Sequence, residues 1–343
     1  MRFRPAWHPF ILAFCARALR PQLSLGVSQR LQVDLMKEKS PPFHSAEIKR
    51  HDFGLIRDQF DSLRVAMGNK LEREWPRSGK FNVGGGKALV LGLYKGAENA
   101  LGASRMLMAD TPPNPARKAE YALAASPLTR SILDVLCSIV FVFGDFAPRV
   151  LWYYKAGWRE VVEETERLEA AYGSDPEWKE NLAGRRELIE HGKTAFELTA
   201  DEAAGLVAIK RWPIPERMLK TLPDESDRHV YIRYLIDWFY RTLSQEAHHS
   251  WAGLARSYPL LVPGQLPDDQ RKHHLELMRT RQVNMSLTLM MAIITELELE
   301  FRFGLNERAK YVWSILREWS EEAKDIYDRF YRPVLGSADA TAI

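Results

Sequence analysis

The chain of 343 residues is long enough to bury a large core in one or two domains. Its hydrophobic content of 46% and charged content of 27% are typical of a soluble globular protein. The formal net charge of +3 comes from residues 1–35, which carry five Arg against one Asp and leave a charge of −1 on the remaining chain. This balance excludes a strongly basic body that would bind nucleic acid through its overall charge.

The cysteine count and the apolar segments narrow the class of protein further. Cys15 and Cys137 lie far apart in the sequence, which favours a reducing compartment, the cytoplasm, over a disulfide framework or a thiolate metal site. No uninterrupted apolar stretch reaches the roughly 18 residues of a spanning helix, so no membrane association is expected. Residues 1–40 resemble a marginal signal or transit peptide, but their Arg content favours a disordered leader or an over-extended reading frame.

Apolar residues at helical spacing predict the first three helices. The first covers 45–74 and the second 87–109, separated by a glycine-rich stretch. The third, over 117–146, is hydrophobic nearly all round and should be the central helix. Its β-branched run at 139–142 also resembles a buried strand, but no second strand candidate exists to pair with it.

The second half of the chain continues the helical pattern. A charged helix from 148 to 173 is followed by a polar helical hairpin over 176–199 that projects from the body or packs loosely. Ser226 or Asp227 should cap a helix that extends to Trp251. Another helix is expected over 268–303, stopped by Gly304, and Asn306 should cap the last one.

The predicted fold is therefore all-α: a mostly antiparallel helical bundle with no sheet. It forms a single domain over 45–331, and the tail over 332–343, from Pro333 onward, should be disordered.

The helix expected over 230–251 has two unlike faces. One is an apolar stripe, and the other carries polar residues at alternating spacings of three and four. Tyr and Trp stand near this second face where a solvated helix would carry Lys and Glu. We therefore expect a half-buried polar site formed by Tyr234, Asp237, Arg241, Ser244 and His248.

A second polar group lies on the predicted central helix, where Arg130, Asp134 and Ser138 follow one another at four-residue spacing. Charges in a core are costly unless they are paired. One interpretation is an internal Arg130–Asp134 pair across one helical turn. In the other, these residues face the 230–251 helix, and the substrate-binding residues are Arg130, Asp134, Tyr234, Asp237 and Tyr240.

Three further motifs are discounted. GGGK at 84–87 and GKT at 192–194 lack the first Gly and the preceding strand of a phosphate-binding loop. A di-metal bundle site needs two Glu-x-x-His pairs, and only Glu246 with His249 fits, beside a local cluster of His273 and His274. No metal or other cofactor is therefore expected.

Four segments appear in a characteristic order between about 85 and 262: TRSILD, WYYKAGW, KRWP and YIRYLIDWFYRTLSQEAHHSWAGL. This order resembles an uncharacterised bacterial helical family whose members carry an Arg-x-x-x-acid helix and a later Tyr…Ser…His helix. The resemblance covers about half of the chain and implies no activity, because the family has none assigned.

The spacing of Arg241 and His248 also resembles, more faintly, that of the HEPN helical domains, many of which are metal-independent ribonucleases. These domains place four to six residues between Arg and His; where Thr242 stands they usually carry Asn, Asp or His. The resemblance implies RNA cleavage, in a stress or phage-defence setting. Arg241 would stabilise charge on the phosphate, His248 would move a proton, and Ser244 or Tyr240 would position the substrate.

Two alternatives stay open. The aromatic-rich helix face could belong to a non-catalytic module that binds a partner protein or a second copy of the chain. The same cleft could instead serve a small-molecule sensor.

Overall fold

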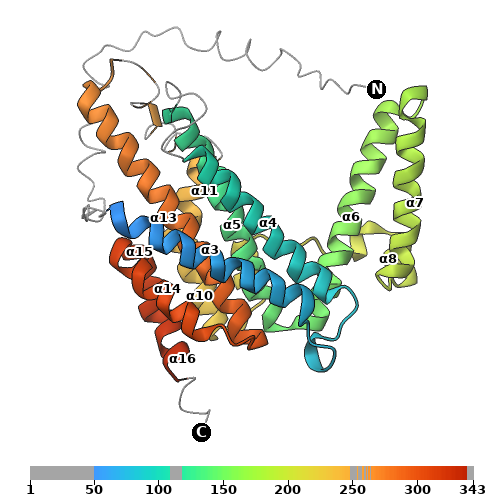
Figure 1. Ribbon diagram of the computed structural model, residues 1–343. Coiled ribbons are helices and arrows are strands. Elements are labelled where there is room, and N and C mark those ends of the chain that lie inside the picture. The colour runs from blue at the N-terminus through green and yellow to red at the C-terminus, as the bar shows by residue number, and fades with distance from the viewer. Residues whose placement is uncertain are drawn as a thin grey trace. The chain divides into compact units, whose positions relative to one another are not determined.

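The computed structural model describes residues 50–108, 118–247 and 264–337, and between the last two ranges Gly253, Ser257, Tyr258, Leu260 and Val262. Every regular element in these residues is a helix, and none is a strand (Figure 1). The helices belong to one compact unit. The prediction of an all-α fold is confirmed.

The helices are α3 (Arg50–Arg73), α4 (Gly86–Leu107), α5 (Lys118–Gly144), α6 (Phe146–Tyr172), α7 (Lys179–Ala195), α8 (Ala200–Ala204), α9 (Pro215–Leu219), α10 (Asp227–Leu235), α11 (Arg241–Ala247), α13 (Asp268–Phe301), α14 (Asn306–Trp319), α15 (Glu321–Ile326) and α16 (Arg332–Ser337). Short 3-10 turns cover Gly79–Phe81, Pro176–Trp178 and Leu206–Ala208, and π-helical segments cover Ile236–Tyr240 and Tyr327–Tyr331. The helices α4, α5 and α6 match their predicted bounds to within two residues.

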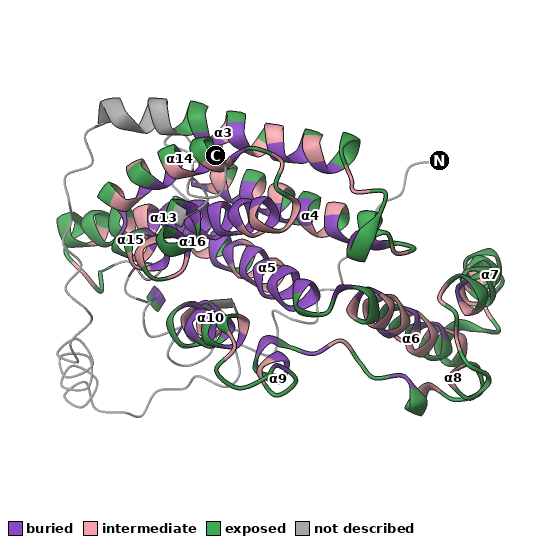
Figure 2. Ribbon diagram, turned by 90° about the horizontal axis from the view of Figure 1, so that it is seen from below, coloured by how far each residue is buried: buried purple, intermediate pink, exposed green. Residues whose placement is uncertain are grey.

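Helix α5 lies at the centre of the bundle and packs against α4, α13, α10 and α11 (Figure 2). Ile132, Leu136 and Phe141 have no exposed surface. The β-branched run at 139–142 is helical, and its side chains are buried. By length and composition alone Glu120–Gly144 could cross a membrane, and 61% of its most apolar window is buried inside the bundle.

The segment 176–199 was predicted as a helical hairpin, but it forms one long helix, α7, which packs against α6 so that these two helices make the hairpin. The Trp158 indole donates to the Ile189 carbonyl at 2.9 Å, and Gly192 lies directly against that indole. Two exposed ion pairs, Arg185–Glu164 and Arg186–Glu169, add little stability. The first turns of α6 contact α5 and α4, so the hairpin is anchored to the bundle at one end.

The junction of α13 and α14 differs from the predicted one. Leu305, rather than Asn306, is the N-cap residue of α14, and it has no side-chain hydrogen bond to offer. The buried Glu298 carboxylate instead accepts the N–H groups of Phe303, Gly304 and Leu305 at 3.1, 2.9 and 2.9 Å. A carboxylate at the N-terminus of α14 accepts hydrogen bonds from N–H groups that have no partner within the helix. Its negative charge also interacts favourably with the positive end of the helix dipole.

The C-terminal region also departs from the expected single helix and disordered tail. Ser320 breaks the helix with extended backbone angles, and its hydroxyl caps α15 by accepting the N–H of Ala323 at 3.2 Å. The predicted tail is helical as far as Ser337, because Leu335 is fully buried and holds α16 in place. Residues 338–343 lie outside the described part of the chain.

Replacing Gly92 by Ala should stabilise the protein. Gly92 is exposed within α4, and a Cβ there would meet no atom within 4 Å. Because Ala is favoured over Gly in a helix interior, the free energy of unfolding in urea should rise by about 0.5–1 kcal/mol. Gly192→Ala is the matched control: its Cβ would lie 2.4 Å from Trp158 Cδ1 and should destabilise the fold. Equal effects of the two substitutions would contradict this packing.

Candidate functional site

The helix that carries most of the predicted site contains a π-helical segment. Helix α10 continues through Ile236–Tyr240 in π geometry before α11 begins at Arg241. A π turn holds more residues than an α turn, so it rotates the residues after it relative to a 3.6-residue period. The predicted apolar stripe is still buried at Ile232, Leu235, Ile236, Phe239 and Leu243. Of the described residues of the predicted polar stripe, Tyr234 is buried, Ser244 is half-buried, and Asp237 and Arg241 are exposed.

Arg130 of α5 meets Tyr240 at the end of the π segment. The guanidinium carbon of Arg130 lies 3.6 Å from the centroid of the Tyr240 ring. Its Nε donates to both carboxylate oxygens of Asp134 at 3.2 and 3.1 Å. Its Nη1 is buried and finds no acceptor among the residues that the structure describes. The predicted Arg130–Asp134 pair is therefore present, and it lies against a predicted substrate-binding residue.

Burial around the Arg130–Tyr240 contact keeps the Tyr240 phenol and the nearby Cys137 thiol protonated. Tyr240 is buried, and desolvation raises its pKa; Arg130 lowers it, and the carboxylates of Glu216 and Asp134 raise it. Burial, with a smaller effect of Asp134, also raises the pKa of the Cys137 thiol far above its usual range. Glu216, an exposed residue of the short helix α9, was not among the predicted site residues, because no local spacing in the sequence links it to α5.

Three predicted site residues do not join Arg130 in a buried cluster. Asp237 and Arg241 pair with each other at 3.5 Å on the surface, where their side chains are 49% and 73% exposed. Tyr234 is buried, but its hydroxyl donates to Asp325 of α15 at 2.7 Å. The expectation of a half-buried face was therefore wrong for Asp237 and Arg241, because their positions lie opposite the buried apolar stripe and no described element covers them.

The remaining residues lie at the end of the helix. Ser244 is partly buried in α11, one turn beyond Tyr240, and α11 packs against α5. His248 lies outside the described residues, as do His249 and the side chain of Glu246. The structure thus brings together Arg130, Asp134 and Tyr240.

A second polar cluster was not anticipated. The hydroxyls of Tyr231 in α10 and Tyr331 at the end of the second π segment are 2.6 Å apart, although the residues are 100 positions apart in the sequence. Tyr331 is also hydrogen-bonded to Glu296 of α13. Desolvation raises the pKa of Glu296 to about 7, against a smaller lowering by Arg228. The only sequence signal was an acidic residue within an apolar core helix.

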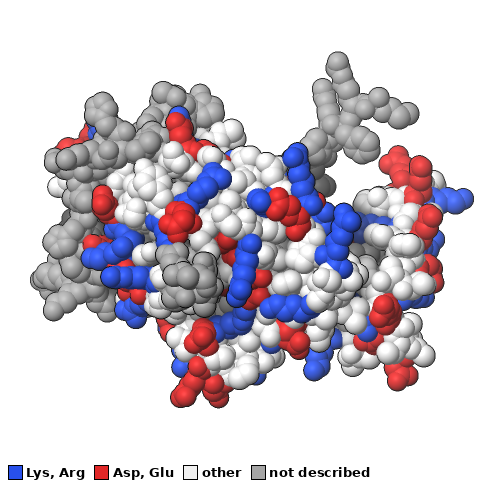
Figure 3. Space-filling model, turned by 60° about the horizontal axis from the view of Figure 1, so that its bottom comes forward, with Lys and Arg blue, Asp and Glu red and all other residues white. Residues whose placement is uncertain are grey.

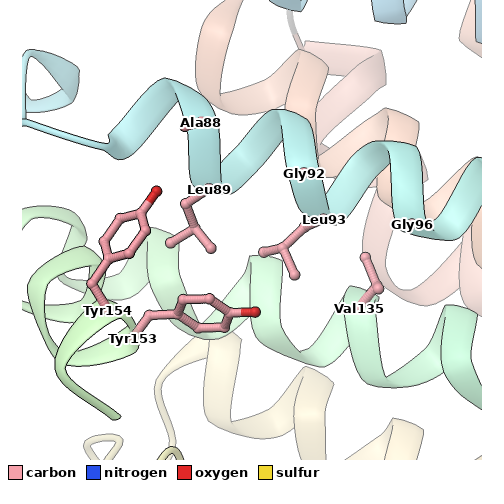
Figure 4. Close-up of a pocket in the computed structure, with 8 residues that line it drawn as sticks. All are labelled: Ala88, Leu89, Gly92, Leu93, Gly96, Val135, Tyr153 and Tyr154. Atoms are coloured by element: carbon pink, nitrogen blue, oxygen red, sulfur yellow. The ribbon is translucent and has the colours of Figure 1, made fainter. Parts of the chain in front are cut away.

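The rest of the surface offers fewer chemical groups. The described residues contain no group of three or more potential metal-ligating side chains. A groove of about 260 Å³ between α4, α5 and α6 has a floor of Leu89, Leu93 and Val135 (Figure 4). The hydroxyl of Tyr154, on its wall, donates to the Gly85 carbonyl. Basic and acidic side chains are interspersed on the face in Figure 3. The groove suits apolar contact rather than catalysis.

No family model, curated protein or solved structure matches the chain. Both family resemblances therefore remain predictions.

Glu296 should make stability fall as pH rises. The folded protein holds the Glu296 proton up to about pH 7, whereas the unfolded chain releases it near the ordinary value of 4.5. The stabilising contribution is thus fully present below the ordinary pKa and is lost as pH rises through the folded pKa. Between about pH 5 and about pH 8, the free energy of unfolding of the wild type should fall by roughly 1–3 kcal/mol more than that of Glu296→Gln, measured by urea unfolding.

The matched control for this measurement is Glu187→Gln, an exposed acid on α7. It should leave the pH dependence unchanged. The same pH slope in wild type and Glu296→Gln would show that Glu296 is not held in its neutral form.

Proposed function

We propose that the protein binds single-stranded RNA at the junction of α5 and α11 and cleaves it without a metal ion. The observation that supports this proposal is the buried, unused hydrogen-bond donor of the Arg130 guanidinium. Its guanidinium is fixed by Tyr240 and Asp134, while Nη1 is buried and has no acceptor among the residues described. An unpaired buried donor costs about 1–3 kcal/mol. A phosphate oxygen accepting from Nη1 would remove that cost.

In this mechanism the 2′-oxygen of RNA attacks the adjacent phosphorus, and the bond from phosphorus to the 5′-oxygen breaks. His248 takes the proton of the 2′-hydroxyl, and the leaving 5′-oxygen takes a proton from water. Arg130 stabilises the charge that develops on the phosphate. Arg130 thereby takes the role first expected of Arg241, because Arg241 is exposed on the surface and pairs there with Asp237.

The neighbouring residues position these two groups. Asp134 and Tyr240 hold the Arg130 guanidinium from its Nε edge and from its face, which leaves Nη1 for the substrate. Tyr240 acts by position and not as a base, because its raised pKa keeps the phenol protonated near neutral pH. Ser244, one turn beyond Tyr240, offers a hydroxyl to the ribose or the phosphate.

The test is cleavage of a fluorescent single-stranded RNA by the purified full chain in excess EDTA. We expect His248→Ala and Arg130→Lys each to reduce the rate by about 100-fold or more, since a Lys at 130 keeps the charge but loses the planar fork. An RNA with a 2′-deoxy nucleotide at the cleaved position should resist cleavage. Arg185→Ala, on the exposed hairpin α6–α7, is the control and should cleave like wild type.

Two results would overturn the proposal. One is the absence of RNA cleavage in EDTA by the wild-type chain. The other is cleavage that persists in His248→Ala, which would point to a contaminating nuclease. Circular dichroism melting of each variant separates a lost site from a lost fold.

A further inference from the structure

The outward side of the helix α10–α11 carries large exposed apolar side chains, whereas its inward side is buried in the bundle. Trp238, within the π segment, is 58% exposed, and Val230 is 47% exposed. Figure 2 shows buried and exposed residues side by side on α10. A Trp that is more than half exposed on a core helix leaves much apolar surface in water, which is typical of contact sites.

Trp238 is the outer edge of a layer of aromatic rings. Its ring lies 6.2 Å from that of Tyr234, which lies 5.2 Å from that of Phe330. The Tyr234 hydroxyl is fixed by Asp325, and the Arg329 guanidinium lies over the Tyr234 ring at 5.7 Å. This layer connects the two π segments. Trp, Tyr and Arg in a rigid setting are the residues that dominate protein–protein interfaces.

The charges on this side of the helix alternate in sign. Arg233, Asp237 and Arg241 are all exposed and are spaced by four residues. The pair of Asp237 with Arg241 is long and solvated, so it contributes little to folding. In an antiparallel pair of such helices, each Asp237 would face an Arg of the other chain. The pattern is therefore complementary to itself.

We propose that a second copy of this chain docks on this face, with the two α10–α11 helices antiparallel about a two-fold axis near Trp238. A two-fold interface joins the same patch on both subunits, which an alternating-charge helix satisfies. The two Trp238 rings lie at the centre of the interface, and each Asp237 pairs with the partner's Arg241. A nucleic acid fits this face less well, because Asp237 interrupts its basic residues and Arg329 is held by Asp325.

The experiment measures the mass of the full chain by sedimentation velocity between about 1 and about 100 µM. Wild type should be a dimer over part of this range. Trp238→Ala should weaken the dimer at least about tenfold, since a central Trp dominates such contacts. Met106→Ala, on α4, is the matched control: Met106 is 64% exposed, and its loss should leave the dimer unchanged.

A charge exchange tests the geometry itself. Asp237→Arg places three Arg in a row and should abolish the dimer through repulsion. Adding Arg241→Asp to that variant restores opposite charges across the two-fold axis and should recover the dimer. Both substitutions are on the surface and should leave thermal unfolding nearly unchanged.

Three outcomes would overturn the inference. The first is a wild-type chain that stays monomeric throughout the concentration range. The second is a dimer that survives both Trp238→Ala and Asp237→Arg, which would place the interface elsewhere. The third is a monomer whose binding of single-stranded RNA depends on Trp238, which would assign the face to nucleic acid. RNA cleavage is measured on Arg130 and His248 variants, so the two proposals fail separately.

Discussion

Helix α5 has almost no polar face, so the helices around it are placed by the need to cover it. Helices α4, α13, α10 and α11 together enclose its apolar side chains. The few polar side chains of α5 therefore contact the side chains that the covering helices place beside them. Arg130 is 13% exposed and contacts the Tyr240 ring and the Asp134 carboxylate, while its Nη1 has no acceptor within the described part of the chain. The packing that covers α5 thus holds the Arg130 guanidinium in place and leaves its Nη1 donor unused.

The π segments decide how the covering helices present their side chains. The first brings Tyr240 to Arg130 while leaving Trp238, Asp237 and Arg241 in solvent. The second ends at Tyr331, whose hydroxyl meets Tyr231. A π turn is less favourable than an α turn and persists where tertiary contacts require it. The hydrogen bonds and ring contacts between these two segments are such contacts.

The helix α10–α11 therefore has one side in the buried core and one side in solvent. Its inward side contributes to the Arg130 contact, where low exposure strengthens electrostatic interactions. Its outward side carries Trp238 and alternating charges, where solvent weakens the Asp237–Arg241 pair. The Tyr153 and Tyr154 groove is a third environment, lined by apolar side chains and glycines without a charged group.

The sequence by itself determined what short-range physics controls. Helical spacing predicted α4, α5 and α6, four-residue spacing predicted the Arg130–Asp134 pair, and Ser226 caps α10 as expected. Only the tertiary structure decided the π segment that ends at Tyr240 beside Arg130, the Glu298 carboxylate that stands in for the Asn306 cap, and the Tyr231–Tyr331 contact. These features depend on contacts between segments that lie far apart in the chain. A periodicity of 3.6 residues shows which face of one helix is apolar, but it does not show which distant segment that face contacts.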